Sequence, residues 1–485
     1  MNKKMIAYIL GNVIKIAGIL MLLPCIVSIV YSENVGFYYL GIGILSILIG
    51  VFLTLKKPEN TVFYLKEACI ITALSWIVLS IVGSLPFFIS GEIPSFTDAM
   101  FETVSGFTTT GASILSNVEA LSYTALFWRS FTHWIGGMGV LVFLLAIIPL
   151  SGGSHINIMR AESTGPSVGK LVPKIKSTAR ILYLIYFGLT IIMIGFLLAG
   201  GMSIFDSLTT AFGTAGTGGF GIKNDSLMSY SPYIQWVVTI FMIIFGINFN
   251  AFYLILFGHI RKAFSIEEVK WYLIIIATSI AVIFFSILDT SASVFEALTH
   301  SSFQVASIIT TSGYASIDFN TWASAAKCIL VLLMFIGACS GSTGGGIKVS
   351  RFIVAFKTFL KETKTYLHPK SVKKVYMDGK PVEHEVIRSV NVYFVTFIFL
   401  FATSVFLVSL EGKDLTTTFT AVAATINNIG PGLEQVGPTS NFGHFTDFSK
   451  WVMIFDMLAG RLELFPLIML FHPSLWKEFF SRKKK

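Results

Sequence analysis

The chain has 485 residues, of which 54% are hydrophobic and 13% are charged, with a mean hydropathy of +0.76 and a formal net charge of +9. Soluble domains carry about 25% charged residues, so most of this chain does not face water and a string of soluble domains is excluded. The Lys and Arg residues stand in blocks between apolar stretches, a placement typical of membrane topology and not of nucleic-acid binding.

Ten stretches are long and apolar enough to cross a membrane, which takes about 20 residues in a helix. The first is longer than the core of a signal peptide and is expected to be retained. The predicted spans are 5–31, 36–55, 66–90, 124–150, 178–200, 232–257, 270–289, 323–356, 386–410 and 449–472.

Four shorter segments, 95–107, 205–215, 294–309 and 415–427, are too short to cross. Each follows a full span and precedes a glycine-containing polar stretch, a pattern that favours a short helix returning to the side from which it entered. With the N-terminus in the cytoplasm and these segments re-entrant, the basic blocks fall on the cytoplasmic side at every crossing. Both termini are therefore expected in the cytoplasm.

The order of these segments predicts an all-α integral membrane protein. Two N-terminal transmembrane helices are followed by four helix–pore loop–helix repeats in a pseudo-fourfold arrangement. The predicted units are residues 1–60 for the two helices, and 61–152, 153–260, 261–365 (with a broken second helix) and 366–485 (with a basic tail) for the repeats.

The glycine-containing stretches predict a cation pathway. Aligning them pairs Gly111, Gly218, Gly313 and Gly430. A short helix directs the negative end of its dipole at the membrane centre, and exposed carbonyls at that depth are tolerated only where they line water. Four such strands form rings of carbonyls that replace an ion's hydration shell; glycine-rich turns between packed helices are the alternative. The predicted cation-coordinating residues are Thr109, Thr110, Gly111, Thr217, Gly218, Thr311, Ser312, Gly313, Asn428, Ile429 and Gly430.

The span 323–356 contains a glycine-rich segment that breaks the helix. A nucleotide-binding loop is disfavoured, because Ile347 separates the glycines from Lys348 and no strand precedes them. An unwound segment that gates the pore and a passive kink between packed helices both remain open. The candidate gating residues are Gly341, Ser342, Thr343, Gly344, Gly345 and Gly346.

Arg461 is a second gating candidate, since it lies near the middle of the last span. An arginine at the bilayer centre costs about 2.5–3.5 kcal/mol on insertion scales, so it should face the protein interior or water. A structural salt bridge with Glu463 or Asp456 is the alternative.

The remaining polar residues indicate no enzyme and no organic cofactor. Cys25, Cys69, Cys328 and Cys339 lie in apolar stretches without metal-ligand spacing, so neither a disulfide framework nor a zinc site is implied. Glu102, on the first short helix, either braces the filter or bonds locally.

Together, the four filter segments, the glycine-rich break and the arginine of the last helix resemble those of the superfamily of Trk, Ktr and HKT potassium transporters. The chain is most similar to the TrkH kind over nearly its whole length, because two helices precede the first repeat. The fourth strand departs from the pattern, since Asn427-Asn428-Ile429-Gly430-Pro431 has no Thr or Ser before its glycine.

The resemblance implies potassium uptake across the bacterial inner membrane by a homodimer with one pore per protomer. It also implies that Gly341–Gly346 forms an intramembrane gating loop and that Arg461 lines the pore below the filter. A cytoplasmic nucleotide-binding subunit of the TrkA kind is expected on the face that carries the basic segment from Arg351 to Arg388, which could instead face membrane lipids. A proton- or sodium-coupled symporter is the alternative function.

Overall fold

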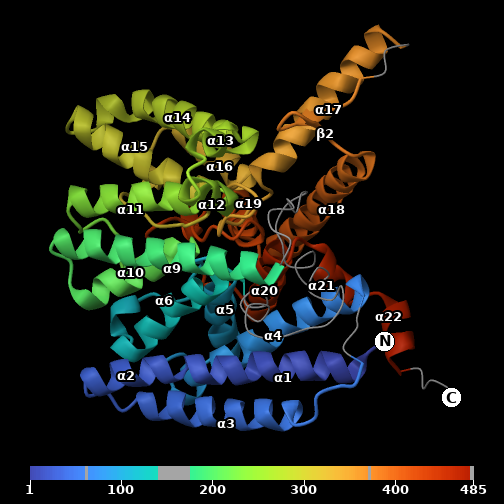
Figure 1. Ribbon diagram of the computed structural model, residues 1–485. Helices are drawn as coiled ribbons and strands as arrows, with labels where there is room; N and C mark the ends of the chain where they lie inside the picture. The colour runs from blue at the N-terminus through green and yellow to red at the C-terminus, as the bar shows by residue number, and fades with distance from the viewer. Residues whose placement is uncertain (61–63, 140–174, 370–372, 481–485) are drawn as a thin grey trace.

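The computed structural model describes residues 1–60, 64–139, 175–369 and 373–480. Within these ranges the only strands are the short hairpin β1 (Tyr376–Met377) and β2 (Lys380–Pro381), and the rest of the regular structure is helical (Figure 1). The all-α prediction is confirmed. The end of the predicted span 124–150, the boundary at residue 152 and the last residues of the basic tail lie outside the described residues.

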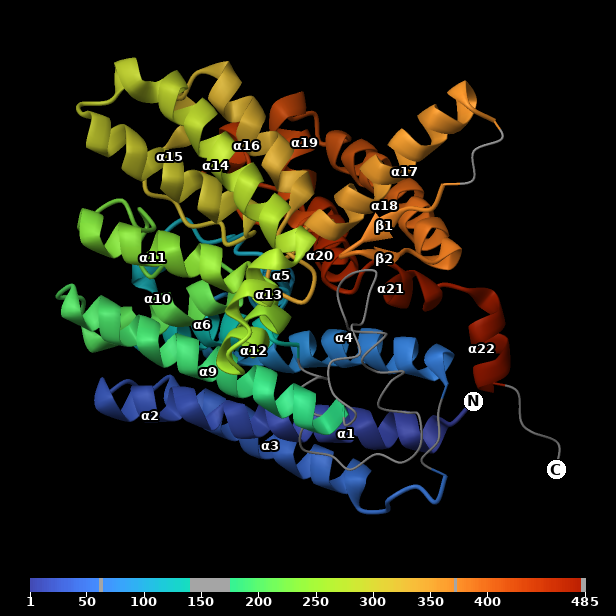
Figure 2. The ribbon, with the colours of Figure 1, turned by 45° about the horizontal axis from the view of Figure 1, so that its top comes forward.

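The chain begins with α1 (Lys3–Leu20) and α2 (Leu22–Val30), which follow one another in line, and α3 (Gly36–Thr54) runs beside them along one edge of the molecule (Figures 1 and 2). Glycines allow the backbones of α1 and α3 to approach closely, as is common between membrane helices. A side chain on Gly18 would place its Cβ 2.5 Å from the carbonyl oxygen of Gly43. α1 and α3 thus form a tightly packed pair beside the first repeat.

A long helix, a short helix, an extended segment outside any sheet (called a filter strand below) and a second helix then recur four times. The first set is α4 (Leu65–Ser90), α5 (Phe96–Phe107) and α6 (Tyr123–Gly137), and the second is α9 (Ile175–Ala199), α10 (Ile204–Gly216), α11 (Pro232–Phe245) and α12 (Phe249–Leu256), followed by α13 (Ile260–Ser265). The third is α14 (Glu267–Ile287), α15 (Val294–Ile309), α16 (Ser324–Ile336) and α17 (Val349–Leu367), and the fourth is α18 (His384–Ser409), α19 (Leu415–Ile426), α20 (Asp447–Arg461), α21 (Phe465–Met469) and α22 (Pro473–Phe480).

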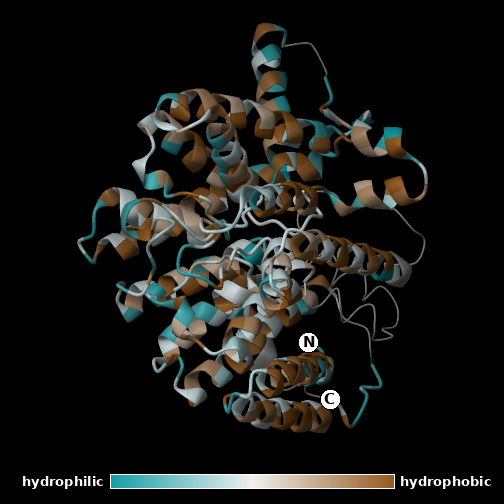
Figure 3. Cartoon of the chain, turned by 90° about the vertical axis from the view of Figure 1, so that its left-hand side faces the viewer, coloured by the Kyte–Doolittle hydropathy of each residue, from teal (hydrophilic) through white to brown (hydrophobic). Residues whose placement is uncertain are grey.

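The described residues contain six helices long and apolar enough to cross a membrane, or seven if the bent pair α11–α12 is one span. Hydrophobic residues cover much of the outer helices (Figure 3). Two of the predicted spans, 232–257 and 449–472, are each formed by two helices and not by one. The first bends by 92° between α11 and α12, and the second ends its helix at Arg461 before α21 begins. The span 323–356 is interrupted at residues 337–348, which contain the glycine-rich segment.

The four short helices begin alike, because a Ser or Asp side chain caps each of them. Ser95, Ser203, Ser293 and Asp414 accept hydrogen bonds from Asp98, Asp206, Glu296 and Thr417 backbone N–H groups. Their N-terminal residues are largely accessible, whereas the last residues of all four are buried. Each short helix therefore enters the protein and ends in its interior.

Candidate functional site

The C-terminal ends of the four short helices share one geometry. A backbone N–H beyond the helix donates to a carbonyl five residues earlier, which is the long bond of a Schellman motif. These bonds join Thr110 to Ser105, Gly218 to Gly213, Ser312 to Ser307 and Ile429 to Ala424, all at 2.8 Å. The same hydrogen-bond pattern recurs four times although the sequences differ.

The residue before each of these donors has a left-handed backbone. Its φ is +54° at Thr109, +55° at Thr217, +59° at Thr311 and +55° at Asn428. Threonine rarely adopts this conformation, and each instance costs on the order of 1–3 kcal/mol. Strain of this kind collects where the backbone must present particular groups, and here it recurs in every repeat.

The backbone corrects the sequence alignment in the second repeat. Two residues after the left-handed residue, φ is again positive at Gly111, Gly219, Gly313 and Gly430. Gly219, and not Gly218, is therefore the counterpart of Gly111. Gly218 instead takes the position between the two strained residues, which Thr110 takes in the first repeat.

The residues between the two positive-φ positions are Thr110, Gly218, Ser312 and Ile429. Their carbonyls form a closed ring. A Cβ on Gly111 would lie 2.0 Å from the Gly218 oxygen, and one on Gly219 would lie 1.7 Å from the Ser312 oxygen. A Cβ on Gly313 would lie 2.0 Å from the Ile429 oxygen, and one on Gly430 would lie 2.9 Å from the Thr110 oxygen, which completes the series. Each strand thus contacts the next and the fourth contacts the first, so the four strands surround one axis.

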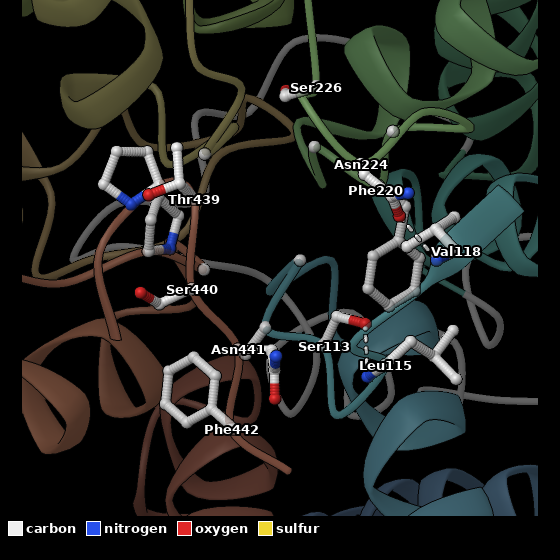
Figure 4. Close-up of a pocket in the computed structure, with 18 of the residues that line it drawn as sticks. Ser113, Leu115, Val118, Phe220, Asn224, Ser226, Thr439, Ser440, Asn441 and Phe442 are labelled. Carbon is white, nitrogen blue, oxygen red and sulfur yellow. Dashed lines mark hydrogen bonds between the residues drawn. The ribbon is translucent and has the colours of Figure 1, made fainter. Parts of the chain in front are cut away.

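A cavity of about 140 Å³ adjoins the ring on the side of the strands' C-terminal ends. All four glycines of the ring line it, together with polar residues that include Asn224, Thr439, Ser440 and Asn441 (Figure 4). Asn224 also accepts a hydrogen bond of 2.7 Å from the Val118 backbone N–H, which ties the second strand's loop to the first. A cavity with polar lining residues therefore lies next to the ring on this side.

Glu102 braces the first strand. Its carboxylate accepts hydrogen bonds from the Ser113 hydroxyl and the Ile114 N–H, both at 3.0 Å, and from Arg129 Nε at 2.5 Å. Arg129 in turn donates to the Gly221 carbonyl at 2.7 Å. Of the two roles that the sequence left open for Glu102, these bonds favour bracing, and they extend the brace to the second strand.

The glycine-rich segment contacts the opposite ends of the strands. The Gly345 N–H donates to Thr311 Oγ1 at 2.6 Å, and the Gly346 N–H donates to the Asn427 carbonyl at 3.0 Å. A Cβ on Gly345 would lie 2.6 Å from that same carbonyl. The segment thus packs directly against the beginnings of the third and fourth strands.

Two basic side chains donate hydrogen bonds to the carbonyls of the segment. Lys348, which is 1% exposed, donates to the carbonyls of Gly344 and Gly345. Arg461 donates to the Thr343 carbonyl at 3.0 Å and, from α20, also to the Gly137 carbonyl at 2.9 Å. Arg461 therefore links the segment to the end of α6.

The carboxylates that the sequence offered as partners of Arg461 make other contacts. Glu463 forms an ion pair with Arg351 of α17. Asp456 accepts a hydrogen bond of 2.7 Å from Ser404 of α18. These contacts favour a role for Arg461 at the glycine-rich segment.

Sequence reasoning missed Lys348, Arg351 and Glu268 as parts of this site; Glu268 accepts hydrogen bonds from the Ser340 and Ser350 N–H groups, which flank the glycine-rich segment. The signals available were a lysine directly after the glycine run, an arginine three residues later, and a carboxylate in the first turn of an otherwise apolar span. In the described residues no group of three His, Cys, Asp or Glu side chains is placed to hold a metal ion.

The chain was compared with known proteins. The family model TrkH, described as a cation transport protein, matches residues 38–482. The Trk system potassium uptake protein TrkH of Escherichia coli (strain K12) is 34% identical over 99% of this chain and 100% of its own length. TrkG of the same strain is 32% identical over 98% and 99%. The crystal structure of the potassium transporter TrkH from Vibrio parahaemolyticus superposes with a TM-score of 0.88 at 31% identity, covering 98% of this chain and 100% of that one.

Proposed function

Because this chain belongs to the TrkH family of cation transport proteins, we propose that its four strands form the selectivity filter through which it takes up potassium. The protein is a multi-pass membrane transporter of the Trk type and not an enzyme. The observation that carries the proposal is the closed ring of the Thr110, Gly218, Ser312 and Ile429 carbonyls.

Such a ring suits a dehydrated monovalent cation. Carbonyl oxygens replace the water molecules that K⁺ leaves behind, and four helix C-termini aimed at the ring add the negative ends of their dipoles. Backbone oxygens suffice in the fourth strand, where Ile429 has no hydroxyl. Thr110 and Ser312 carry hydroxyls at the same position, but the Thr110 hydroxyl already accepts from Asn428 at 2.9 Å, which braces the filter. The proposed K⁺-binding set is the predicted one with Gly219 added.

Residues 341–346 are proposed as the gate. The segment lies against the beginnings of the third and fourth strands and accepts a hydrogen bond from the Arg461 guanidinium of α20. A cation within about 5 Å of that charge meets a repulsion of about 3 kcal/mol at an effective dielectric near 20. Opening then requires the segment and the Arg461 guanidinium to move away from the axis.

The assembly is proposed to be a homodimer with one pore per protomer, in which a TrkA-type nucleotide-binding subunit regulates the gate from the cytoplasm. The relatives' Trk-system names support such a partner. The segment best placed to receive it is α17, which projects from the body of the molecule (Figures 1 and 2) and carries Lys357, Lys361 and Lys364. Anionic lipid headgroups are the competing ligands for this basic segment.

The test is rubidium uptake into potassium-loaded liposomes that contain only the purified protein. The expected result is saturable uptake that needs no pH or sodium gradient. Uptake that follows an imposed proton or sodium gradient would favour the coupled symporter. Absence of uptake, even when the gating segment is shortened, would reject the filter proposal.

A further inference from the structure

Glu268 holds both ends of the gating segment. It is the second residue of α14 and only 3% exposed. Its Oε1 accepts hydrogen bonds from the Ser340 N–H at 2.7 Å and from the Ser350 N–H at 3.1 Å. Ser340 directly precedes the segment and Ser350 lies in the first turn of α17, so a single carboxylate oxygen joins the two ends.

The same carboxylate contacts the bend of the second repeat. Asn248, between α11 and α12, donates to Glu268 Oε2 at 3.4 Å. The bend and the segment are also bonded directly, from the Phe249 N–H to the Gly341 carbonyl at 3.0 Å and from the Cys339 N–H to the Gly246 carbonyl at 3.1 Å. In Figure 2 α12 and α13 lie next to the start of α14. The interruptions of the second and third repeats therefore pack together around Glu268.

The charge of Glu268 favours the arrangement in which these bonds exist. A buried carboxylate is costly unless hydrogen-bond donors surround it. The N-terminus of α14 offsets part of that cost, and the two N–H groups of the gating segment supply charge-assisted bonds, which are about twice as strong as neutral ones. When the segment moves away, the anion stays buried and loses these donors.

We propose that Glu268 is a positioning residue that keeps the gating segment across the pore, so that its negative charge lowers the open fraction. The inference depends on the proposed gate. It assigns to the first turn of α14 a role that neither the glycine run nor Arg461 reveals, because Glu268 lies on a different helix from both.

Glu67 offers a matched control. It too is a buried carboxylate, 8% exposed, in the first turn of the first helix of a repeat. Its Oε2 accepts from the Tyr64 N–H at 3.1 Å and so caps its own helix. Glu67→Gln therefore removes the same charge from a similar environment, without the bonds to the gating segment.

The experiment measures rubidium flux per folded molecule for Glu268→Gln and Glu67→Gln in liposomes, with thermal melting on the same samples. Weakening two charge-assisted bonds to neutral ones should raise flux about tenfold for Glu268→Gln. Glu67→Gln should stay within about twofold of the unmodified protein. In a variant that lacks Gly344–Gly346, adding Glu268→Gln should give no further rise.

Unchanged or lower flux from folded Glu268→Gln would overturn the inference, as would an equal rise in Glu67→Gln. If Glu268→Gln yields too little folded protein, Glu268→Asp decides, because the shorter side chain keeps the charge but does not reach both N–H groups. Flux above that of the unmodified protein would support the inference, and unmodified flux would overturn it. If deleting Gly344–Gly346 fails to raise flux, the gate proposal itself fails; if only Glu268→Gln fails to do so, this inference fails alone.

Discussion

Replacing Gly313 by alanine separates the filter's geometry from general backbone strain. Gly313 has φ +78°, and an added Cβ would lie 2.0 Å from the Ile429 oxygen. Gly412, in the turn after α18, has φ +75° with nothing within 4 Å of an added Cβ. Both substitutions force alanine into a left-handed backbone, at about 1–2 kcal/mol. Real Cβ atoms essentially never approach within 3.0 Å, so only Gly313→Ala requires the Ile429 carbonyl to retreat by about 1 Å.

A displacement of that size should disable the ring. Misplacing a positioned group by about 1 Å can lower a rate by about a hundredfold, so rubidium flux should fall by about that factor for Gly313→Ala. Gly412→Ala should retain its flux and lose only the stability that the left-handed backbone costs, whereas Gly313→Ala should lose at least as much stability. Rubidium uptake and melting are measured on the same reconstituted samples. Equal flux in the two variants would refute the reasoning, because strain alone would then account for whatever loss is seen.

Three further changes test the parts around the ring. Deleting Gly344–Gly346 should raise rubidium flux per folded molecule, because the segment leaves the strand entrances; unchanged flux from folded protein would favour a passive kink. Arg461→Ala should raise flux, and Arg461→Lys should raise it less, since lysine keeps the charge but not the forked donors; a loss of melting temperature without a rise in flux would assign Arg461 a structural role. Glu102→Gln leaves Arg129 buried without its ion-pair partner and should destabilise the fold by about 3–5 kcal/mol, with weaker discrimination of potassium from sodium in competition uptake; unaltered melting and selectivity would show that the pair does not brace the filter.

The repeat pattern was predictable because its signals are local. The length of each short segment and the glycine-containing polar stretch after it lie within about twenty residues of one another. The register of the second filter strand was not predictable, because Gly218 and Gly219 fit the sequence pattern equally well. Packing decides it: a Cβ on Gly218 would lie 1.9 Å from the His133 ring, which fills the space behind the strand.

The bend at Gly246 and the partners of Arg461 depend on residues far apart in the chain. The span 232–257 is hydrophobic enough on average for a single crossing although it contains Gly246, Asn248 and Asn250, so mean hydropathy gives no sign of the bend, which is stabilised by bonds to Cys339 and Gly341. Sequence proximity suggested Glu463 for Arg461, but Arg351, more than a hundred residues earlier, forms the ion pair with Glu463. A single sequence without a fold does not reveal such long-range competition.

The central claim is that one ring of four carbonyls binds the transported ion. Diffraction from crystals grown with rubidium in place of potassium tests it most directly, because the anomalous signal locates the ion. A peak on the axis, surrounded by the carbonyls of Thr110, Gly218, Ser312 and Ile429, is the predicted result. Rubidium bound only in the cavity that adjoins the ring, or elsewhere in the protein, with none at the ring, would contradict it.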